Sequence, residues 1–169
     1  MDGAILLWIQ ENIRNETLTP WVIFFTGLGH YGAIWAAGAV VLALLPATRR
    51  MGLLSLASLL FSGGLGEIFK LICKRQRPFL QVEDLVALGQ LPHSYSCPSG
   101  HTICAFSVAF ILWRMCHGWQ RWLIMLVAAL MAFSRLYLGV HYPTDILAGI
   151  IVAVCGSCIV WKYRSRIGL

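Results

Sequence analysis

Long apolar runs alternate with short polar segments along the chain, and this pattern predicts helices that cross a membrane. A span needs about 20 apolar residues, fewer where neighbouring protein covers its ends. The runs that meet this requirement are 30–46, 51–73, 100–116, 119–138 and 143–161. Their length is typical of helices and exceeds that of buried strands. We therefore predict an all-α fold, a polytopic membrane helical bundle.

The first 29 residues give a weaker pattern. The runs GAILLWIQENI and LTPWVIFFTGLG are each too short to span, and Arg14, Asn15 and Glu16 separate them. They form either one broken first span or an interfacial helix followed by a half-buried one; a hairpin or broken span is favoured. With this segment the bundle has about six helices. We expect one domain over 1–169, with an N-terminal segment 1–29 and a helical core 30–161.

Composition supports a membrane protein. Apolar residues make up 59% of the chain and charged residues 12%, and the mean hydropathy is +0.74. A soluble domain is usually about 45–50% apolar and roughly 25% charged. The net charge of +6 does not call for a nucleic-acid partner, because basic residues that flank spans anchor them on the cytoplasmic side. We expect the bilayer, and no nucleic acid, as a partner; the sequence gives no oligomeric state.

The basic residues also indicate an orientation. If the five spans alternate in direction, seven basic residues fall on one side: Arg49, Arg50, Arg114, Arg121, Lys162, Arg164 and Arg166. The positive-inside rule makes this side cytoplasmic. Five basic residues fall on the other side: Lys70, Lys74, Arg75, Arg77 and Arg135. Seven against five is a weak bias, which becomes stronger if the second group serves chemistry.

The six cysteines show no metal-ligand spacing, and the chain offers no other metal motif. Cys155 and Cys158 form a CxxC within an apolar run, where free cysteine behaves as a small buried hydrophobe. Cys73 and Cys97 flank one polar loop and can form a disulfide if that loop faces an oxidising compartment. The alternative is that both are free thiols.

Three polar segments at the ends of the spans meet on the non-cytoplasmic side. They read KLICKRQRPF from Lys70, CPSGHT from Cys97 and SRLYLGVHYPTD from Ser134. Charged side chains near the ends of spans often only reach out to the membrane–water interface and have no other role. Charged groups near a bilayer are costly, however, and several that converge on one face indicate a functional site.

The residue types in the first two segments are those of an oxyanion site. Lys70 and Arg77 are seven positions apart and share a helix face if the helix extends that far. Pro78 disfavours a helical Arg77, so Arg77 is expected just beyond the helix end. In the third span, Ser99 can cap the helix and leave the N–H groups near Gly100 free. A helix N-terminus of this kind binds phosphate readily.

The third segment supplies a nucleophile and its partner. Pro143 fits the first turn of the last helix, which places His141 just before the helix and Asp145 inside its first turn. A carboxylate there can accept a hydrogen bond from one imidazole nitrogen and leave the other as an unprotonated nucleophile. Near this side lie His30, Glu67, Lys74 and Arg75, which we interpret as interface charges, although Glu67 can pair with Lys70.

These residues resemble the type 2 phosphatidic acid phosphatase superfamily of membrane lipid phosphatases. Its signatures KxxxxxxRP, PSGH and SRxxxxxHxxxD read here KLICKRQRP, PSGH and SRLYLGVHYPTD, in the same order. The resemblance covers about 30–161 and does not extend to the first 29 residues. It implies a six-helix membrane bundle with a metal-independent active site and no cofactor.

The resemblance also implies roles for single residues. His141 attacks phosphorus and forms a phosphohistidine, Asp145 orients His141, and His101 protonates the leaving oxygen and then activates water. The phosphoryl oxygens are held by Lys70, Arg77, Ser99, Gly100 and Arg135, and Pro78 and Pro98 shape the site.

The substrate implied is a lipid phosphate or pyrophosphate that reaches the site laterally, since the loop from Phe79 to Cys97 is short. Undecaprenyl pyrophosphate at the extracytoplasmic face of the plasma membrane is the preferred reading. Phosphatidylglycerophosphate or phosphatidic acid hydrolysis and lipid phosphotransfer are alternatives. A non-enzymatic anion or lipid transporter is a third, although it has no need of both His101 and the His141–Asp145 pair.

Overall fold

A computed structural model describes residues 1–166, and this part of the chain is helical without a strand. The predicted all-α fold is confirmed. The elements in chain order are α1 Asp2–Asn12, α2 Leu18–Leu28, η1 His30–Gly32, α3 Ala33–Leu44, α4 Arg49–Cys73, η2 Pro78–Leu80, α5 Gly100–Met115, α6 Trp119–Tyr137 and α7 Pro143–Tyr163. The last five α-helices lie within a few residues of the five predicted spans.

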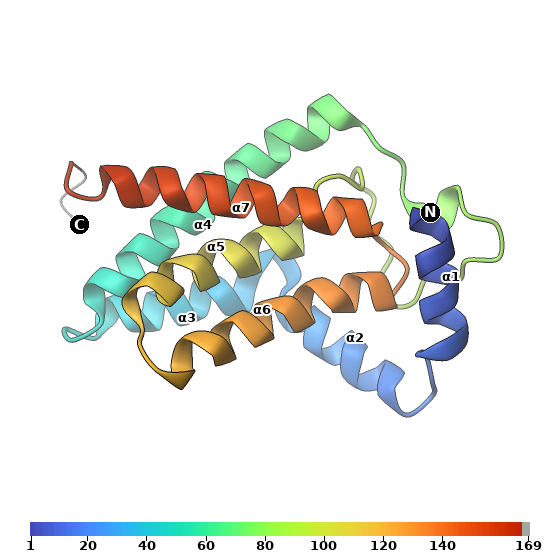
Figure 1. Cartoon of the computed structure of the whole chain (residues 1–169), viewed down its shortest axis with the longest axis horizontal. Helices are drawn as coiled ribbons and strands as arrows, with labels where there is room; N and C mark the ends of the chain where they lie inside the picture. Colours follow the sequence, from blue (N-terminus) through green and yellow to red (C-terminus); the bar gives the residue numbers. More distant parts are fainter. Residues whose placement is uncertain (167–169) are drawn as a thin grey trace.

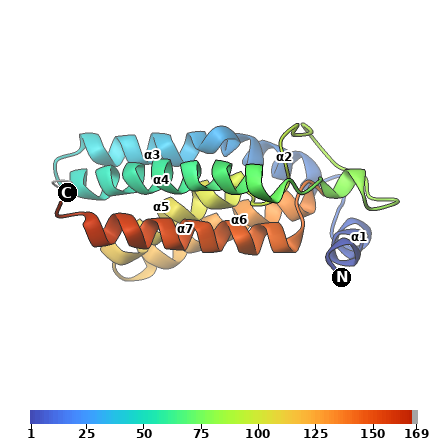
Figure 2. The same ribbon diagram turned by 90° about the horizontal axis from the view of Figure 1, so that it is seen from above.

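Helix α5 lies in the centre of the bundle and packs against α4, α6 and α7 (Figures 1 and 2). Small residues allow the close approach. A Cβ on Gly156 of α7 would lie 2.3 Å from Ser62 Oγ of α4. Ser58 and Ser157 hydrogen-bond each other at 2.8 Å between α4 and α7. Small residues and serine hydroxyls are the usual means by which helices associate in a membrane.

Fewer helices than six have the length and apolarity of a full span. Among the described residues α4 and α7 meet both requirements, and α2 joined to η1 and α3 through a bend of 43° gives a third. Helix α5 has 16 residues, which at 1.5 Å per residue extend about 24 Å, less than the roughly 30 Å hydrocarbon core. The structure therefore does not confirm a count of about six spans.

The N-terminal region holds two helices, α1 and α2, and a break near residue 30 separates α2 from α3. Helix α1 lies across the end of the bundle, whereas α2 leads into α3 (Figures 1 and 2). The break is at Gly29–Gly32, where Gly32 has φ +73° and a Cβ would meet Cys104 Sγ at 2.9 Å. Only glycine adopts this conformation here without strain. The chain bends at this point, and the apolar sequence of α2 continues into α3. Residues 1–29 are thus a separate helix plus the first half of a bent pair.

Helix α1 is packed against the core. Leu6 and Ile9 are buried, Leu6 beside Tyr142 and Ile9 beside Tyr137. Arg14 donates from Nε to the carbonyl of Tyr137 at 2.6 Å. These contacts attach the N-terminal segment to the chain around the third polar segment.

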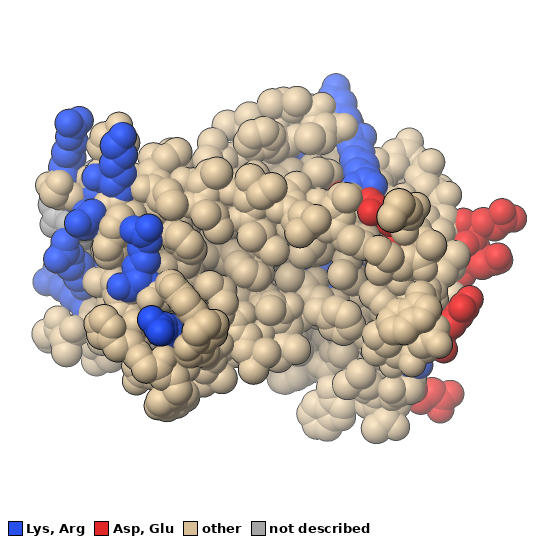
Figure 3. Space-filling view, viewed as in Figure 1, with Lys and Arg blue, Asp and Glu red and all other residues tan. Residues whose placement is uncertain are grey.

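Most of the Lys and Arg visible in Figure 3 gather at the end of the bundle where the chain passes from α3 to α4 and from α5 to α6, and Asp and Glu gather at the opposite end, beside α1. A smaller group of Lys and Arg lies over the far end of α4, near the acidic end. The larger basic group thus lies at the end of the bundle away from α1.

Candidate active site

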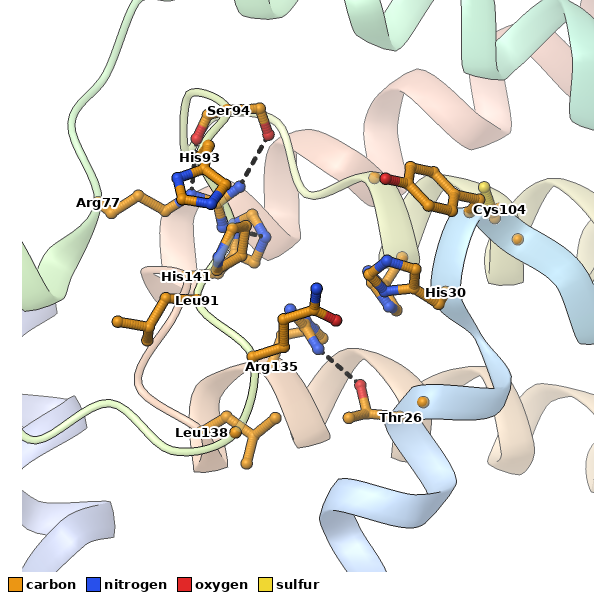
Figure 4. Close-up of a pocket in the computed structure, with 18 of the residues that line it drawn as sticks. Thr26, His30, Arg77, Leu91, His93, Ser94, Cys104, Arg135, Leu138 and His141 are labelled. Atoms are coloured by element: carbon orange, nitrogen blue, oxygen red, sulfur yellow. Dashed lines mark hydrogen bonds between the residues drawn. The ribbon is translucent and has the colours of Figure 1, made fainter.

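The three polar segments meet around one cavity of about 770 Å³ (Figure 4). Its walls come from α2, η1, α4, α5, α6 and the loops after α4 and α6. Of the predicted site residues, those that line it are Lys70, Arg77, Gly100, His101, Arg135 and His141. The described lining thus holds three cations, Lys70, Arg77 and Arg135, and one carboxylate, Glu67.

Arg77 reaches the cavity from beyond a helix end, as predicted. Helix α4 stops at Cys73, Lys74 takes a left-handed conformation (φ 45°), and Arg77 is extended at φ −72° and ψ 148°. The Pro78 ring excludes a helical Arg77. The guanidinium is buried and donates to the carbonyls of Ser94 at 2.8 Å and Val140 at 2.9 Å. Lys70 and Arg77 therefore do not share a helix face, and Arg77 is fixed by the loops.

The contact of Arg77 with His141 fixes the histidine tautomer. Arg77 Nη1 lies 2.9 Å from His141 Nε2. A guanidinium is only a donor, so Nε2 accepts and the ring proton sits on Nδ1. Burial lowers the pKa of His141 to about 3, and the ring is neutral at pH 7. Nε2 is therefore unprotonated, and its lone pair accepts the hydrogen bond from Arg77 at the cavity wall.

Asp145 lies beside His141 with a geometry that differs from the prediction. Its Oδ2 is 3.5 Å from His141 Nδ1, an ion-pair distance that is long for a hydrogen bond. The same oxygen accepts hydrogen bonds from the Ser96 hydroxyl and from the Tyr142 backbone N–H at 2.9 Å. The hydrogen bond from Tyr142 is part of a capping box at the start of α7, which fixes the carboxylate. Helix α7 begins at Pro143, as predicted.

Arg75 is a further partner of Asp145, and the interpretation of Arg75 as an interface charge was wrong. Its Nη1 donates to Asp145 Oδ1 at 2.8 Å, and its Nη2 pairs with Asp2 of α1 at 3.0 Å. The guanidinium also lies 3.9 Å from the centre of the Tyr142 ring. Arg75 thus joins the N-terminal helix to the carboxylate next to His141.

The other two cations differ in how they are held. Arg135 is buried, donates to Thr26 Oγ1 at 2.7 Å, and leaves its Nε without a partner among the described residues. Lys70 pairs with Glu67 at 2.7 Å, as predicted. A buried donor without a partner is costly, so Arg135 is suited to an anionic ligand.

The PSGH segment opens α5, with Ser99 as the residue before the helix. Ser99 does not cap it through its side chain; its Oγ instead accepts a hydrogen bond from Thr102 at 3.0 Å. Ser99 is fully buried and does not line the cavity, whereas Gly100 and His101 do. The His101 Nε2 is buried without a partner in the described residues. Pro78 and Pro98 are fully buried, consistent with shaping the loops.

The structure also bears on the predicted disulfide and on metal binding. Cys73 and Cys97 are free thiols, although the two interact and burial raises the pKa of Cys97 to about 11. No group of three or more His, Cys, Asp or Glu in the described residues is arranged to hold a metal ion.

Sequence reasoning missed several residues that hold the site: Thr26, Arg75, Ser94 and Ser96. The spacing of Arg75 and Arg77 could have indicated the role of Arg75. Residues two apart in an extended chain share a side, so Arg75 accompanies Arg77 once the helix ends at Cys73. The serines and Thr26 gave no such signal, because their partners are distant in sequence.

Known proteins support the assignment of the three segments to one family. Residues 51–168 match the PAP2 superfamily. An undecaprenyl-diphosphatase of Sulfolobus acidocaldarius is 33% identical over 135 residues, which are 79% of this chain and 64% of that protein. The bacitracin transport permease protein BcrC of Bacillus licheniformis is 30% identical, over 85% of this chain and 70% of the relative. The chain thus spans less than two thirds of the Sulfolobus protein.

Solved structures share the arrangement of helices. The crystal structure of Aquifex aeolicus LpxE superposes with a TM-score of 0.85 at 25% identity, covering 96% of this chain and 95% of that chain. The PAP2-type phosphatidylglycerolphosphate phosphatase of Bacillus subtilis gives 0.73 at 26% identity, covering 98% and 85%. Sequence match, helix arrangement and apolar spans agree that this is a membrane protein, and the chain belongs to the PAP2 superfamily.

Proposed function

We propose that the chain is a membrane lipid phosphatase that acts through a phosphohistidine on His141. The observation that carries the proposal is the unprotonated Nε2 of His141, which faces a cavity with Lys70, Arg77 and Arg135 in its walls. Phosphoryl transfer depends mainly on positioning and on stabilising charge at the phosphoryl oxygens. An unprotonated nitrogen in a cavity lined by three cations meets both requirements.

The bound phosphoryl group forms contacts with polar groups of the cavity wall. Arg135 Nε has no partner among the described residues, and the N–H groups at the start of α5 point outward from the helix end. Arg77 transfers its Nη1 hydrogen bond from His141 to a phosphoryl oxygen, which frees Nε2. Lys70 leaves Glu67, an exposed carboxylate, for the substrate.

The reaction then has two steps. The Nε2 lone pair forms the N–P bond while the bond from phosphorus to the leaving oxygen breaks, and His101 gives a proton to that oxygen. In the second step His101 takes a proton from water, the water oxygen bonds to phosphorus, and the N–P electron pair returns to Nε2. Asp145 stabilises the positive charge that His141 gains, and the reaction needs no metal or cofactor.

The preferred substrate is undecaprenyl pyrophosphate. Two observations support it: the similarity to an undecaprenyl-diphosphatase, and the basic surface at the opposite end of the bundle (Figure 3). By the positive-inside rule that surface is cytoplasmic, so the cavity faces the extracytoplasmic side of the plasma membrane, where a spent lipid carrier is available. Because a phosphatidylglycerolphosphate phosphatase shares the fold, phosphatidylglycerophosphate is the second candidate.

Phosphate release by the purified chain tests the proposal. Undecaprenyl pyrophosphate, phosphatidylglycerophosphate and phosphatidic acid are compared with EDTA present, and His141→Ala serves as the inactive control. We expect EDTA-resistant release that falls by about a thousandfold or more in the variant, because a nucleophile cannot be replaced by binding alone. Full activity of His141→Ala would refute the mechanism. Release only with an alcohol acceptor would indicate a phosphotransferase, and tight binding without release a transporter.

A further inference from the structure

The break between α2 and α3 places a histidine, which the mechanism above does not use, in the cavity wall. His30 lines the cavity, and its ring centre lies 6.1 Å from that of His101 in an edge-to-face arrangement. Figure 4 shows His30 on the opposite side of the cavity from Arg77 and His141. His30 therefore lies next to the proposed proton donor and across the cavity from the nucleophile.

The backbone around His30 is fixed by tight contacts. Tyr31 has φ 50° and is 95% exposed, with its ring edge-to-face against His30 at 4.4 Å between ring centres, so packing against the core does not stabilise this conformation. Such residues are uncommon and gather at ligand sites, held by the structure around them. A Cβ on Gly29 would lie 3.2 Å from His101 Cδ2 and 2.8 Å from Met131. The backbone of the turn therefore packs closely against His101, which keeps His30 next to it.

The position of His30 is where the leaving group must emerge. In phosphoryl transfer the attacking and leaving atoms are roughly in line. With His141 on one side of phosphorus, the leaving oxygen is on the side of His101 and therefore of His30. A lipid monophosphate leaves as a neutral alcohol once His101 protonates it. A lipid diphosphate leaves as a lipid phosphate, which keeps a negative charge.

We propose that His30 binds the phosphate group that remains on the lipid when a diphosphate is cleaved. The ring N–H donates to an oxygen of this second phosphate, while Lys70, Arg77 and Arg135 hold the phosphoryl group that is transferred. His30 then favours lipid diphosphates over lipid monophosphates. This inference rests on the proposed phosphatase function and concerns its substrate class.

The test measures binding and turnover separately. Isothermal titration calorimetry gives the affinities of the purified protein for inorganic pyrophosphate and inorganic phosphate, in wild type, His30→Ala and His30→Gln. We expect His30→Ala to weaken pyrophosphate binding by about tenfold, since a hydrogen bond to a charged group contributes about that much, and to change phosphate binding less than twofold. His30→Gln, whose amide can donate, should retain part of the pyrophosphate affinity. His117→Ala, in the loop between α5 and α6 at the opposite end, is the matched control.

Turnover of undecaprenyl pyrophosphate is measured on the same preparations, and we expect kcat/KM to fall about tenfold in His30→Ala. Because both affinities come from one sample, the ratio of pyrophosphate to phosphate affinity is insensitive to partial unfolding. An unchanged ratio in His30→Ala would overturn the role of His30 even if the wild type releases phosphate. A wild type that prefers pyrophosphate through His30 but releases no phosphate would instead overturn the proposed function and leave the second phosphate site standing.

Discussion

Asp145→Asn tests the role of the buried carboxylate with almost no change of shape. Asp145 is fully buried and accepts hydrogen bonds from Arg75 at 2.8 Å, from the Tyr142 backbone N–H at 2.9 Å and from the Ser96 hydroxyl. An asparagine has one oxygen, so its NH₂ group must face either the Arg75 guanidinium or the Tyr142 N–H. Both are donors, and one hydrogen bond is lost in either orientation.

The effect on rate follows from the charge that His141 gains when its Nε2 bonds to phosphorus. His141 Nδ1 lies 3.5 Å from Asp145 Oδ2. At an effective dielectric constant of about 20, two unit charges at this distance attract by roughly 5 kcal/mol. Since each 1.36 kcal/mol is tenfold in rate, removing the carboxylate charge lowers kcat by roughly three orders of magnitude. The neutral His141 of the resting protein has no such attraction, so KM changes much less.

The assay is steady-state phosphate release in detergent, with thermal unfolding followed on the same samples. Asp84→Asn is the matched control, because Asp84 is exposed in the loop after η2 and its positive φ of 62° is one that asparagine tolerates. The lost hydrogen bond destabilises the fold by about 1–3 kcal/mol. An Asp145→Asn variant with kcat within tenfold of wild type would refute the reasoning, since a charge at 3.5 Å could then not be stabilising the phosphohistidine.

Two further substitutions separate positioning from packing. Arg75→Gln should lower kcat about fivefold to tenfold with little change in KM, because the Arg75 side chain is 34% exposed and water screens part of its attraction for Asp145. Partial recovery of kcat in Arg75→Lys would show that the charge is responsible. A fall in kcat as deep as that of Asp145→Asn would contradict a secondary role for Arg75. Gly52→Ala should lower the unfolding midpoint by about 6 °C or more, because its Cβ would lie 2.1 Å from Ala43 N of α3. Gly38→Ala, with open space at its Cβ, should keep the midpoint or raise it slightly, because alanine favours a helix interior over glycine. Equal midpoints for the two variants would contradict the predicted clash.

Structural features that depend on neighbouring residues were predicted well from the sequence. Apolar runs gave the five long helices, since hydropathy and helical period are properties of neighbouring residues. Pro78 and Pro143 placed Arg77 outside a helix and Asp145 inside one, as the structure has them. The count of spans was less certain, because α5 is short and whether α2 and α3 act as one unit depends on a bend at Gly29–Gly32.

Contacts within the site depended on tertiary structure. Arg77 meets His141 over 64 positions, Thr26 meets Arg135 over 109, and Asp2 meets Thr144 over 142. No local pattern encodes such pairs, because they form only when the helices pack. By itself the sequence determined that a membrane helical bundle would bring two histidines, a carboxylate and several cations to one end. Only the packed structure decided that Arg75 holds Asp145 and that His30 faces His101, since the direction of a side chain in a loop is set by the helices around it.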